Sequence, residues 1–369
     1  MARLGDICSL QSGGTPTRNN PDFFAGHIPW ITTVALNGDI IDERNAVEMI
    51  SEKAISNSAA KVVPPYSIMV GTRVGIGKVA INKVPMSTSQ DIISLIGIDE
   101  SAWDRKYLLK FIQGKSSYLI SQARGATIKG IKAEVLADMV LPQHTLPIQR
   151  RIAATLDKVS EGIALCKQML ADLDELVKSQ FIELFGDVEN NPKGIRVMKW
   201  NDVFLTKTGK LDSNAMVEGG QYPFFTCAKE AHWIDKYAFD CEALLLAGNN
   251  AVGVYDVKHY KGKFNAYQRT YVLQLKDDSW SYEFFKNQLE LKLEYLRVNS
   301  LGSNTRYLTM KILGEIAFLV PDTVKQNEWA RFIQQSDKSK LAVQHQLAEL
   351  ETLKKSLMQE YFGYCERKA

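Results

Sequence analysis

The last part of this chain repeats a segment from its middle. Residues 149–186 align with residues 326–363 at a constant offset of 177, without a gap, and 11 of the 38 positions are identical. Several identical pairs are polar, among them Gln149 with Gln326, so a shared helical composition does not explain the match. A chain built from two copies of one module is expected to act on a duplicated or two-fold target.

Length and composition favour two globular domains. The 369 residues are 45% hydrophobic and 24% charged, which is typical of soluble globular proteins. The N-terminus lacks the basic and apolar regions of a signal peptide, and no apolar run approaches the roughly 20 residues that span a bilayer. The five cysteines are scattered, which argues against a disulfide framework or a zinc site. We therefore expect a cytoplasmic protein without a membrane partner.

Both copies of the repeat have the pattern of a long helix. In the first copy the apolar residues follow heptad spacing, at Ile152, Leu156, Val159, Ile163, Cys166, Leu170, Leu173, Val177 and Leu184. The second copy is less regular, because Ser336, Lys340 and Lys354 interrupt its apolar seam. Proline precedes each segment, and Gly186 or Gly363 follows it, which is the usual punctuation of a helix. The two helices are predicted to pair antiparallel, since the first leads from one domain to the other and the second leaves that domain.

The pattern upstream of each helix predicts a domain of mixed helix and strand. Short apolar runs bounded by turn residues predict strands at 67–70, 78–81, 92–98, 243–246 and 271–275, and helical patterns are limited to 102–122, 280–297 and 131–138. Fainter matches with insertions relate the two domains, such as Leu4-Gly-Asp-Ile7 with Trp200-Asn-Asp-Val203. We predict an α+β fold with two largely antiparallel domains, residues 1–147 and 187–321, and two helical segments, residues 148–186 and 322–369.

No catalytic constellation is evident in the sequence. Residues 71–78 resemble a phosphate-binding loop, but Thr72 replaces its first glycine and Val79 follows the lysine, so a glycine-rich hairpin is favoured. Asp278, Glu290 and Lys292 have the order of a nuclease motif. They fall in a helical pattern rather than a strand, and a solvated helix face is the preferred interpretation. No pair of histidines has the spacing of metal ligands.

Polar residues in turn-rich segments are candidates for contacts with DNA. Residues 258–269 mix lysines with aromatic residues, which suits a loop that contacts phosphate, or alternatively a solvated hairpin with its aromatic side chains turned inward. Net charge is only +3, so basic residues must be clustered locally, or partner subunits must supply part of the phosphate contact. The predicted contact residues are Arg18, Asn19, Arg73, Lys78, Gln90, Arg124, Thr127, Lys129, Lys210, Asn249, Asn250, Lys258, Lys261, Lys263, Gln268, Arg269 and Arg306.

Several motifs together resemble the specificity subunit of type I restriction-modification systems. They are Leu4-Gly-Asp-Ile7, Ser12-Gly-Gly-Thr-Pro16, Ile28-Pro-Trp-Ile31, Arg124-Gly-Ala-Thr127, Gln149-Arg-Arg-Ile152 and the distal helix sequence of residues 350–363. The resemblance covers nearly the whole chain. The second domain departs from it, because residues 208–212, Thr-Gly-Lys-Leu-Asp, stand where an equivalent of Ser-Gly-Gly-Thr-Pro would be expected.

The resemblance implies a non-catalytic subunit in which each domain reads one half of an interrupted, asymmetric site in double-stranded DNA. It implies that the helix pair sets the spacing and docks two methyltransferase subunits, with restriction and translocase subunits in the full complex, in phage defence. Such a subunit holds no cofactor of its own, and its partners use S-adenosylmethionine, ATP and Mg²⁺. The alternatives are a coiled-coil scaffold whose end domains bind proteins, and a nuclease that uses Glu290 and Lys292.

Overall fold

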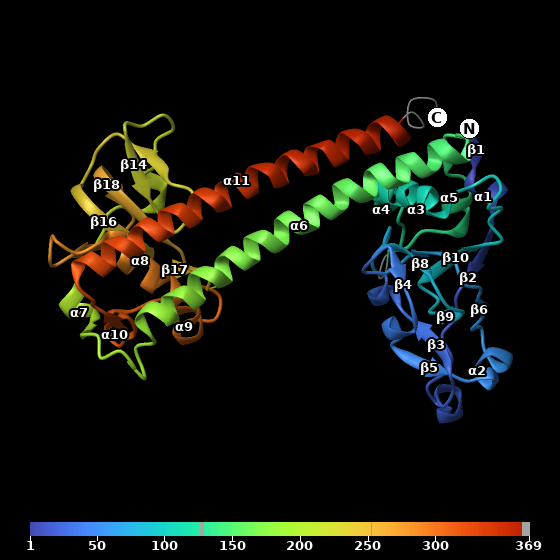
Figure 1. Ribbon diagram of the computed structural model, residues 1–369, viewed down its shortest axis with the longest axis horizontal. Coiled ribbons are helices and arrows are strands. Elements are labelled where there is room, and N and C mark those ends of the chain that lie inside the picture. Colours follow the sequence, from blue (N-terminus) through green and yellow to red (C-terminus); the bar gives the residue numbers. More distant parts are fainter. Residues whose placement is uncertain (126–128, 252, 364–369) are drawn as a thin grey trace. The chain divides into compact units, whose positions relative to one another are not determined.

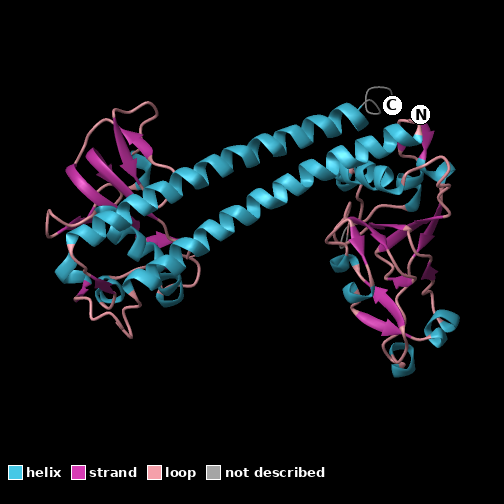
Figure 2. Ribbon diagram, in the orientation of Figure 1, coloured by secondary structure: helices cyan, strands magenta, loops and turns pink. Residues whose placement is uncertain are grey.

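The computed structural model describes residues 1–125, 129–251 and 253–363. The chain forms two compact units, each of mixed helix and strand (Figures 1 and 2). Unit 1 comprises Met1–Lys167 and Gln346–Ala369, and unit 2 comprises Gln168–His345. The two long helices, α6 (Leu146–Phe185) and α11 (Thr323–Phe362), each contribute one part to unit 1 and the other part to unit 2.

Unit 1 contains three small sheets, with strand orders β1-β11, β2-β10-β7-β8-β4 and β5-β3-β9-β6. Most neighbours are antiparallel, but β3 with β9 and β4 with β8 are parallel. The strands are β1 (Ala2–Arg3), β2 (Ser9–Ser12), β3 (Ile28–Ile31), β4 (Ile40–Ile41), β5 (Glu48–Ile50), β6 (Val62–Val63), β7 (Ile68–Gly71), β8 (Val79–Asn82), β9 (Met86–Thr88), β10 (Ile92–Ile96) and β11 (Val140–Leu141).

Unit 2 is built around a six-stranded sheet of order β13-β19-β16-β18-β14-β15, with the two-stranded pairs β12-β21 and β17-β20 beside it. Only β14 and β18 pair in parallel among its named strands in the described part of the chain. The strands are β12 (Val197–Lys199), β13 (Phe204–Thr208), β14 (Tyr222–Phe225), β15 (His232–Ile234), β16 (Phe239–Ala247), β17 (Asn249–Asn250), β18 (Val257–Ala266), β19 (Thr270–Leu275), β20 (Arg306–Tyr307) and β21 (Ala317–Leu319). The predicted α+β class and the five predicted strands are confirmed.

The shorter helices other than α2 correspond between the units. The shorter helices of both units are α1 (Leu4–Ile7), α2 (Glu52–Asn57), α3 (Arg105–Gly114), α4 (Ser116–Ser121), α5 (Ala133–Ala137), α7 (Trp200–Val203), α8 (Tyr282–Leu291), α9 (Leu293–Asn299) and α10 (Met310–Gly314). Two predicted helices are each broken in two. The breaks fall at Lys115 and Lys292, where ψ is near 9° and 2° rather than helical.

The gap-free repeat begins earlier than the sequence match suggests. Helices α3, α5 and α6 each map onto α8, α10 and α11 at the same offset of 177 residues. The correspondence reaches back to the N-caps of α3 and α8, where the side chains of Asp104 and Ser281 accept hydrogen bonds from Tyr107 N and Phe284 N. Side-chain identity is low between residues 104 and 148, so in the sequence only faint matches such as Tyr118-Leu119 with Tyr295-Leu296 indicate this part of the repeat.

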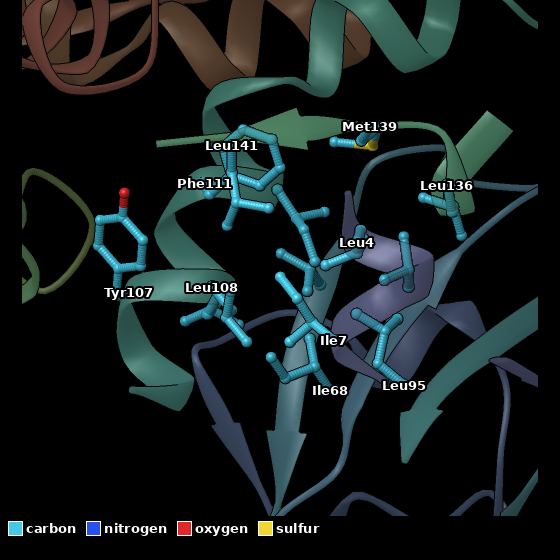
Figure 3. Close-up of a cluster of buried hydrophobic side chains, with 14 of the residues drawn as sticks. Leu4, Ile7, Ile68, Leu95, Tyr107, Leu108, Phe111, Leu136, Met139 and Leu141 are labelled. Atoms are coloured by element: carbon cyan, nitrogen blue, oxygen red, sulfur yellow. The ribbon is translucent and has the colours of Figure 1, made fainter. Parts of the chain in front are cut away.

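The core of unit 1 explains why its first residues fold as they do. Leu4 and Ile7 of α1 are buried against the β7 and β10 strands and α3, and the side chains in Figure 3 interleave from all of these elements. In unit 2, Trp200 and Val203 of α7 occupy the equivalent core positions and are both fully buried. The sequence match between the two segments therefore reflects a shared packing role.

The long helices pack antiparallel within each unit. In unit 1, Gly162 of α6 lies against Leu350 of α11, and Lys167 pairs with Glu351 at 3.3 Å. In unit 2, Lys340 of α11 pairs with Asp174 of α6 at 2.7 Å. The predicted antiparallel pairing is confirmed.

The apolar seam of α6 changes near its end. Leu184, which was predicted to lie on the seam, is 51% exposed. Val177, Phe181 and Phe185 are buried instead, at steps of four residues, because this end of the helix packs on the core of unit 2. No helix in the part of the chain that the structure describes combines the length and apolar character needed to cross a bilayer.

Candidate nucleic-acid interface

Four regions of unit 1 meet at one edge, which we call loop edge 1, and its described residues are Gly13–Gly14, Thr72–Lys78, Gln90–Asp91, and Arg124–Gly125 with Lys129–Ile131. Thr72 links the middle of this edge, because its N–H donates to Asp91 O at 2.8 Å and its carbonyl accepts from Ile131 N at 2.8 Å. Arg124 and Gly130 exchange two backbone hydrogen bonds of 2.9 Å and close the last segment.

Unit 2 repeats this pattern of backbone hydrogen bonds at loop edge 2, whose described residues are Gly209–Lys210, Gly248–Ala251, Gly253, Gln268–Arg269 and Leu301–Leu308. Gly248 takes the place of Thr72, with its N–H donating to Arg269 O and its carbonyl accepting from Leu308 N, both at 2.8 Å. Leu301 and Tyr307 exchange backbone hydrogen bonds of 3.0 and 2.8 Å, as Arg124 and Gly130 do. The same three backbone links therefore build both edges.

A glycine allows the first segment of each edge to approach the next turn. A Cβ on Gly13 would lie 2.2 Å from Ser89 O, and a Cβ on Gly209 would lie 1.7 Å from Ala266 O. The two glycines follow equivalent residues, since Ser12 pairs with Ile93 on β10 and Thr208 pairs with Tyr271 on β19. The second domain departs from the Ser-Gly-Gly-Thr-Pro motif in sequence, as expected, but Gly209 supplies the structural counterpart of Gly13.

The segment from Gly71 to Lys78 is the glycine-rich hairpin that was favoured over a nucleotide-binding loop. It joins the antiparallel strands β7 and β8, and Gly75 and Gly77 have φ angles of 70° and 81°, which favour glycine. A side chain on Gly77 would meet Ser116 of α4 at 2.4 Å. The hairpin is thus held against the helical part of its unit.

Loop edge 1 carries five predicted contact residues within the described segments. Arg73, Lys78, Gln90, Arg124 and Lys129 are all exposed there. Arg73 lies 3.7 Å from Asp91, so part of its charge is balanced within the edge. Thr127, which was also predicted to contact DNA, lies outside the described residues.

Loop edge 2 carries six predicted contact residues: Lys210, Asn249, Asn250, Gln268, Arg269 and Arg306. Gln268 donates to Asp212 Oδ2 at 3.3 Å, and Arg306 donates to Arg297 O at 3.1 Å. Arg306 corresponds to Lys129 at the offset of 177, so both edges place a cation at this position. Ser303 and Asn304 are exposed in the same loop, and the extended repeat was the signal that could have identified them.

Arg18 and Asn19 lie outside loop edge 1. Arg18 donates two hydrogen bonds of 2.9 Å to the carboxylate of Glu48 on β5, and its guanidinium lies 5.2 Å from the ring centroid of Phe24. Asn19 is exposed in the same segment. The structure therefore separates this pair from the residues that meet at the edge.

The predicted loop at residues 258–269 is mostly a strand, and that expectation was wrong for the part within β18. Pairing with β16 over Val257–Phe264 extends the backbone, and Phe264 is fully buried, so the aromatic residues do turn inward. Lys258 is paired with Asp256, and Lys261 with Glu242 at 2.9 Å. Lys263 lies 4.7 Å from the ring centroid of Tyr237. Gln268 and Arg269 lie in the turn after β18, at loop edge 2.

A half-buried histidine joins β18 to two neighbouring elements of unit 2. His259 Nδ1 lies 2.6 Å from Glu283 Oε1 on α8, and Nε2 lies 2.9 Å from Glu242 Oε1 on β16. The hydrogen bond with Glu283, aided by Glu242, raises the pKa of His259. The ring of Tyr282 stacks on the imidazole at 5.4 Å between centroids.

Two of the nuclease-like residues lie on a helix. Glu290 and Lys292 lie at the end of helix α8, as predicted, rather than on a strand. Glu290 is partly exposed on this helix, where Lys286 pairs with it at 3.3 Å and partial burial raises its pKa. Within residues 1–125, 129–251 and 253–363, no cluster of histidine, cysteine and acidic side chains has the geometry to hold a metal ion.

Comparison with known proteins places this arrangement in a family. Residues 1–175 and 192–352 match the family model of the type I restriction modification DNA specificity domain. A stretch of 138 residues is 38% identical to the EcoDI specificity subunit of Escherichia coli, which is 37% of this chain and 29% of that protein. A stretch of 226 residues is 28% identical to the MjaIX specificity subunit of Methanocaldococcus jannaschii, covering 57% and 52% respectively. The match thus spans less than two thirds of either relative.

Solved structures share the fold along nearly the whole chain. The S subunit of a type I restriction-modification system from M. genitalium aligns with a TM-score of 0.62 at 16% identity, covering 98% of this chain and 95% of that one. A chain from a structural study of complex assembly in a type I system aligns with a TM-score of 0.59 at 19% identity, covering 98% and 96%. Since the family model accounts for most of its residues in two stretches, this chain belongs to the type I restriction-modification DNA specificity family.

Proposed function

We propose that this chain is the DNA-specificity subunit of a type I restriction-modification complex, in which each loop edge reads one half of an interrupted, asymmetric site. The observation that carries this proposal is the repeated backbone frame of the two edges, which presents different side chains in each unit. Amide and guanidinium groups are suited to the hydrogen-bonding edges of bases, whereas lysines suit phosphates. Two similar frames with different side chains are suited to two different half-sites.

The proposal assigns chemistry to partner subunits. Two methyltransferase subunits that use S-adenosylmethionine would dock on α6 and α11, and restriction subunits that use ATP and Mg²⁺ would join them in the full complex. The helix pair would also set the spacing between the half-sites. A net charge of +3 supports the division of labour, because a subunit of such low charge needs partners to supply further phosphate contacts.

The test is a methylome comparison of cells that carry the complete system with wild-type or altered chain. Asn249→Ala combined with Gln268→Ala removes two amides from loop edge 2 and leaves its backbone frame intact. We expect one half of the methylated motif to relax or disappear, because a base contact of this kind contributes about 1–3 kcal/mol of discrimination. The other half of the motif, read by loop edge 1, should not change.

The matched control is Gln221→Ala, which removes an exposed amide of unit 2 outside loop edge 2. It should leave the methylated motif as in the wild type. An unaltered motif in the double variant would show that loop edge 2 does not read bases. Loss of both halves of the motif together, with the complex still assembled, would contradict the assignment of one half-site to each unit.

A further inference from the structure

Each unit has a hollow between its helical layer and the long helices, and the repeat relates one hollow to the other. Hollow 1 has a volume of about 540 Å³ and is lined by α3, α4, α6 and α11 in unit 1. Hollow 2 has a volume of about 720 Å³ and is lined by α8, α9, α6 and α11 in unit 2. At the offset of 177, Gln113 of hollow 1 corresponds to Glu290 of hollow 2, and Ser160 corresponds to Asp337. The two hollows are therefore one structural feature with different side chains.

Hollow 1 is basic. Its lining contains four lysines and one carboxylate, Lys110, Lys115, Lys354, Lys355 and Asp39. Lys110 is buried and already neutralised, because it pairs with Asp39 and also with Asp157 at 2.7 Å. Asp39 is further engaged by Gln113 Nε2 at 2.7 Å. The acidic groups are thus used by Lys110, and the lysines of α11 bring additional positive charge.

Lys354 is half-buried in the lining of hollow 1. Burial lowers the pKa of its ammonium group, and the nearby charge of Lys110 lowers it further. A lysine in this position raises the electrostatic energy of the free subunit, and an anion that enters the hollow would reduce that energy. Lys355, the next residue on α11, is exposed at the rim.

Hollow 2 has the opposite balance. Its lining contains four acidic residues, Asp174, Glu290, Glu294 and Asp337, and three lysines, Lys178, Lys286 and Lys340. Most of these charges are paired locally, with Lys340 on Asp174 at 2.7 Å and Lys286 on Glu290 at 3.3 Å. Val177 stands where hollow 1 has Lys354, and Asp337 stands where it has Ser160. An anion would gain little from this site.

The lining of hollow 1 also distinguishes between possible anions. Met358 and Phe362 line the hollow beside the lysines, and both belong to helix α11. A phosphodiester is hydrated and offers no apolar group for such a surface. A glutamate or aspartate on a protein segment provides both a carboxylate for the lysines and aliphatic groups for the partly exposed side chain of Met358.

We infer that hollow 1 is a docking pocket for an acidic segment of one methyltransferase subunit, and that hollow 2 does not bind that segment. This inference rests on the proposed function, since it requires methyltransferase partners. Its consequence is that the two partner positions differ in strength, although the backbone presents the same frame at both. The partner at unit 1 is bound more tightly at low salt, and salt weakens this extra affinity because it depends on charge.

The test measures assembly of the full-length chain with its methyltransferase subunit by analytical ultracentrifugation at low and high salt. In the charge-reversal variant Lys354→Glu combined with Lys355→Glu, we expect one partner to bind on the order of 100-fold more weakly at low salt, because like charges then face each other. The arginine variant, Lys354→Arg combined with Lys355→Arg, retains the charge and should assemble like the wild type. The matched control is Lys178→Glu in hollow 2, which should leave both partners bound.

Each outcome decides the question. The docking pocket is supported if the glutamate variant alone assembles more weakly. The complex that this variant still forms should bind DNA with normal affinity for the number of partners that it holds. Normal assembly with reduced affinity for DNA would overturn it in favour of a phosphate site, and no change in either property would overturn it as well. An equal loss of assembly in Lys178→Glu would refute the asymmetry. A wild-type chain that recruits no methyltransferase subunit would refute the proposed function itself.

Discussion

The two units agree closely in their helical layers and differ in their sheets. From Asp104 and Ser281 onward the secondary structure follows one offset, whereas the sheets before these residues have different strand orders. One residue illustrates the difference. Pro85 lies between β8 and β9 in unit 1. In unit 2 the register of the neighbouring strands places Lys263 at the equivalent position, within the uninterrupted strand β18. Because proline cannot donate to a strand ladder, unit 1 has two short sheets where unit 2 has one continuous sheet.

The comparison shows which parts of the module are constrained. The helical layer of each unit must fit the long helices, and its backbone is shared. The sheets carry the hairpins and turns that form the loop edges, and their lengths and side chains vary. Each loop edge contains residues from both parts. The segment that ends at Ile131 in unit 1, or at Leu308 in unit 2, belongs to the shared helical region, and the other segments come from the sheets. Variation can therefore occur in the loops without loss of the frame.

The largest expected effect is the loss of stability when the phenylalanine at the end of each long helix is removed. It tests whether this contact stabilises the helical layer equally in the two units. Phe362 closes the end of α11 at 5.4 Å from Tyr107 between ring centroids, and Phe185 closes the end of α6 at 5.2 Å from Phe284. Both phenylalanines are almost fully buried. We expect Phe362→Ala to destabilise unit 1, and Phe185→Ala to destabilise unit 2, each by about 3–5 kcal/mol because a large cavity remains.

Hydrogen exchange read separately for the peptides of the two units measures this prediction. Leu184→Ala serves as the control, since its side chain is exposed on the same turn as Phe185 and its loss should change exchange little. Each phenylalanine lies in the same unit as its aromatic partner. If either alanine variant destabilised only the other unit, the equivalence of the two contacts would be wrong.

The helices were predictable because their signals are local and periodic. The heptad spacing and the flanking prolines and glycines indicated both long helices, and the identical Gln149 and Gln326 marked their starts. The gap-free backbone repeat from residue 104 onward was only faintly indicated, by Tyr118-Leu119 and Tyr295-Leu296, because different side chains fill equivalent core positions, as with Tyr107 and Phe284. A packed core accepts many apolar combinations of suitable volume, so the sequence loses similarity before the backbone does.

The second prediction concerns the two buried glutamines at the helix starts. Gln149 accepts from Asp104 N at 2.8 Å and donates to Ala102 O and His144 O. Gln326 accepts from Ser281 N at 3.0 Å and donates to Pro321 O. Each alanine variant leaves buried backbone groups without partners, so we expect a loss of about 2–3 kcal/mol in the free energy of unfolding of the affected unit. The loss should be somewhat larger for Gln149→Ala, because it removes one more hydrogen bond.

Denaturant unfolding followed by hydrogen exchange would rank these variants. Gln168→Ala provides the comparison on the same helix as Gln149, because Gln168 is exposed and bonds only with Asp172 on the surface. A destabilisation by Gln149→Ala no greater than that by Gln168→Ala would mean that the shared glutamine is not needed for the junction.

The candidate interface was only partly predictable from the sequence. Gln90, Arg124 and Lys129 were selected from turn-rich segments, and the structure brings them to one edge. Arg18 had the same local signal but lies elsewhere, because its pairing with Glu48 depends on strand neighbours that are distant in sequence. For the lysines of β18 the sequence left a loop and a hairpin as alternatives, since alternating lysine and aromatic residues also suit a strand whose two faces differ in burial.

The smallest expected effect is a pH dependence confined to unit 2. His259 bridges Glu283 and Glu242, whereas strand register places Ile81 at the equivalent position of unit 1. The hydrogen bond with Glu283 raises the pKa of the histidine in the folded chain. The stabilisation by this bond is therefore complete when the pH is below the pKa of an unfolded histidine, about 6.5. It is lost as the pH rises through the pKa of His259 in the folded chain. The pKa of Glu283 is lowered, with the bond to His259 as its main cause, so this carboxylate loses its contribution only under more acidic conditions.

The measurement compares wild-type protein with His259→Gln below the pKa of an unfolded histidine, at about pH 6, and well above it, at about pH 9. Glutamine retains hydrogen-bonding capacity but cannot carry the charge, so the variant should destabilise β16, β18 and α8 more at the lower pH, with little difference from wild type at the higher pH. Hydrogen exchange in the strands of unit 1 should be unaffected at both values, because the isoleucine there does not titrate. A difference between the two proteins that grew with increasing pH would show that the imidazole is held neutral between the two glutamates, and the charge balance of this junction would then have to be assigned to Lys261 and Lys286.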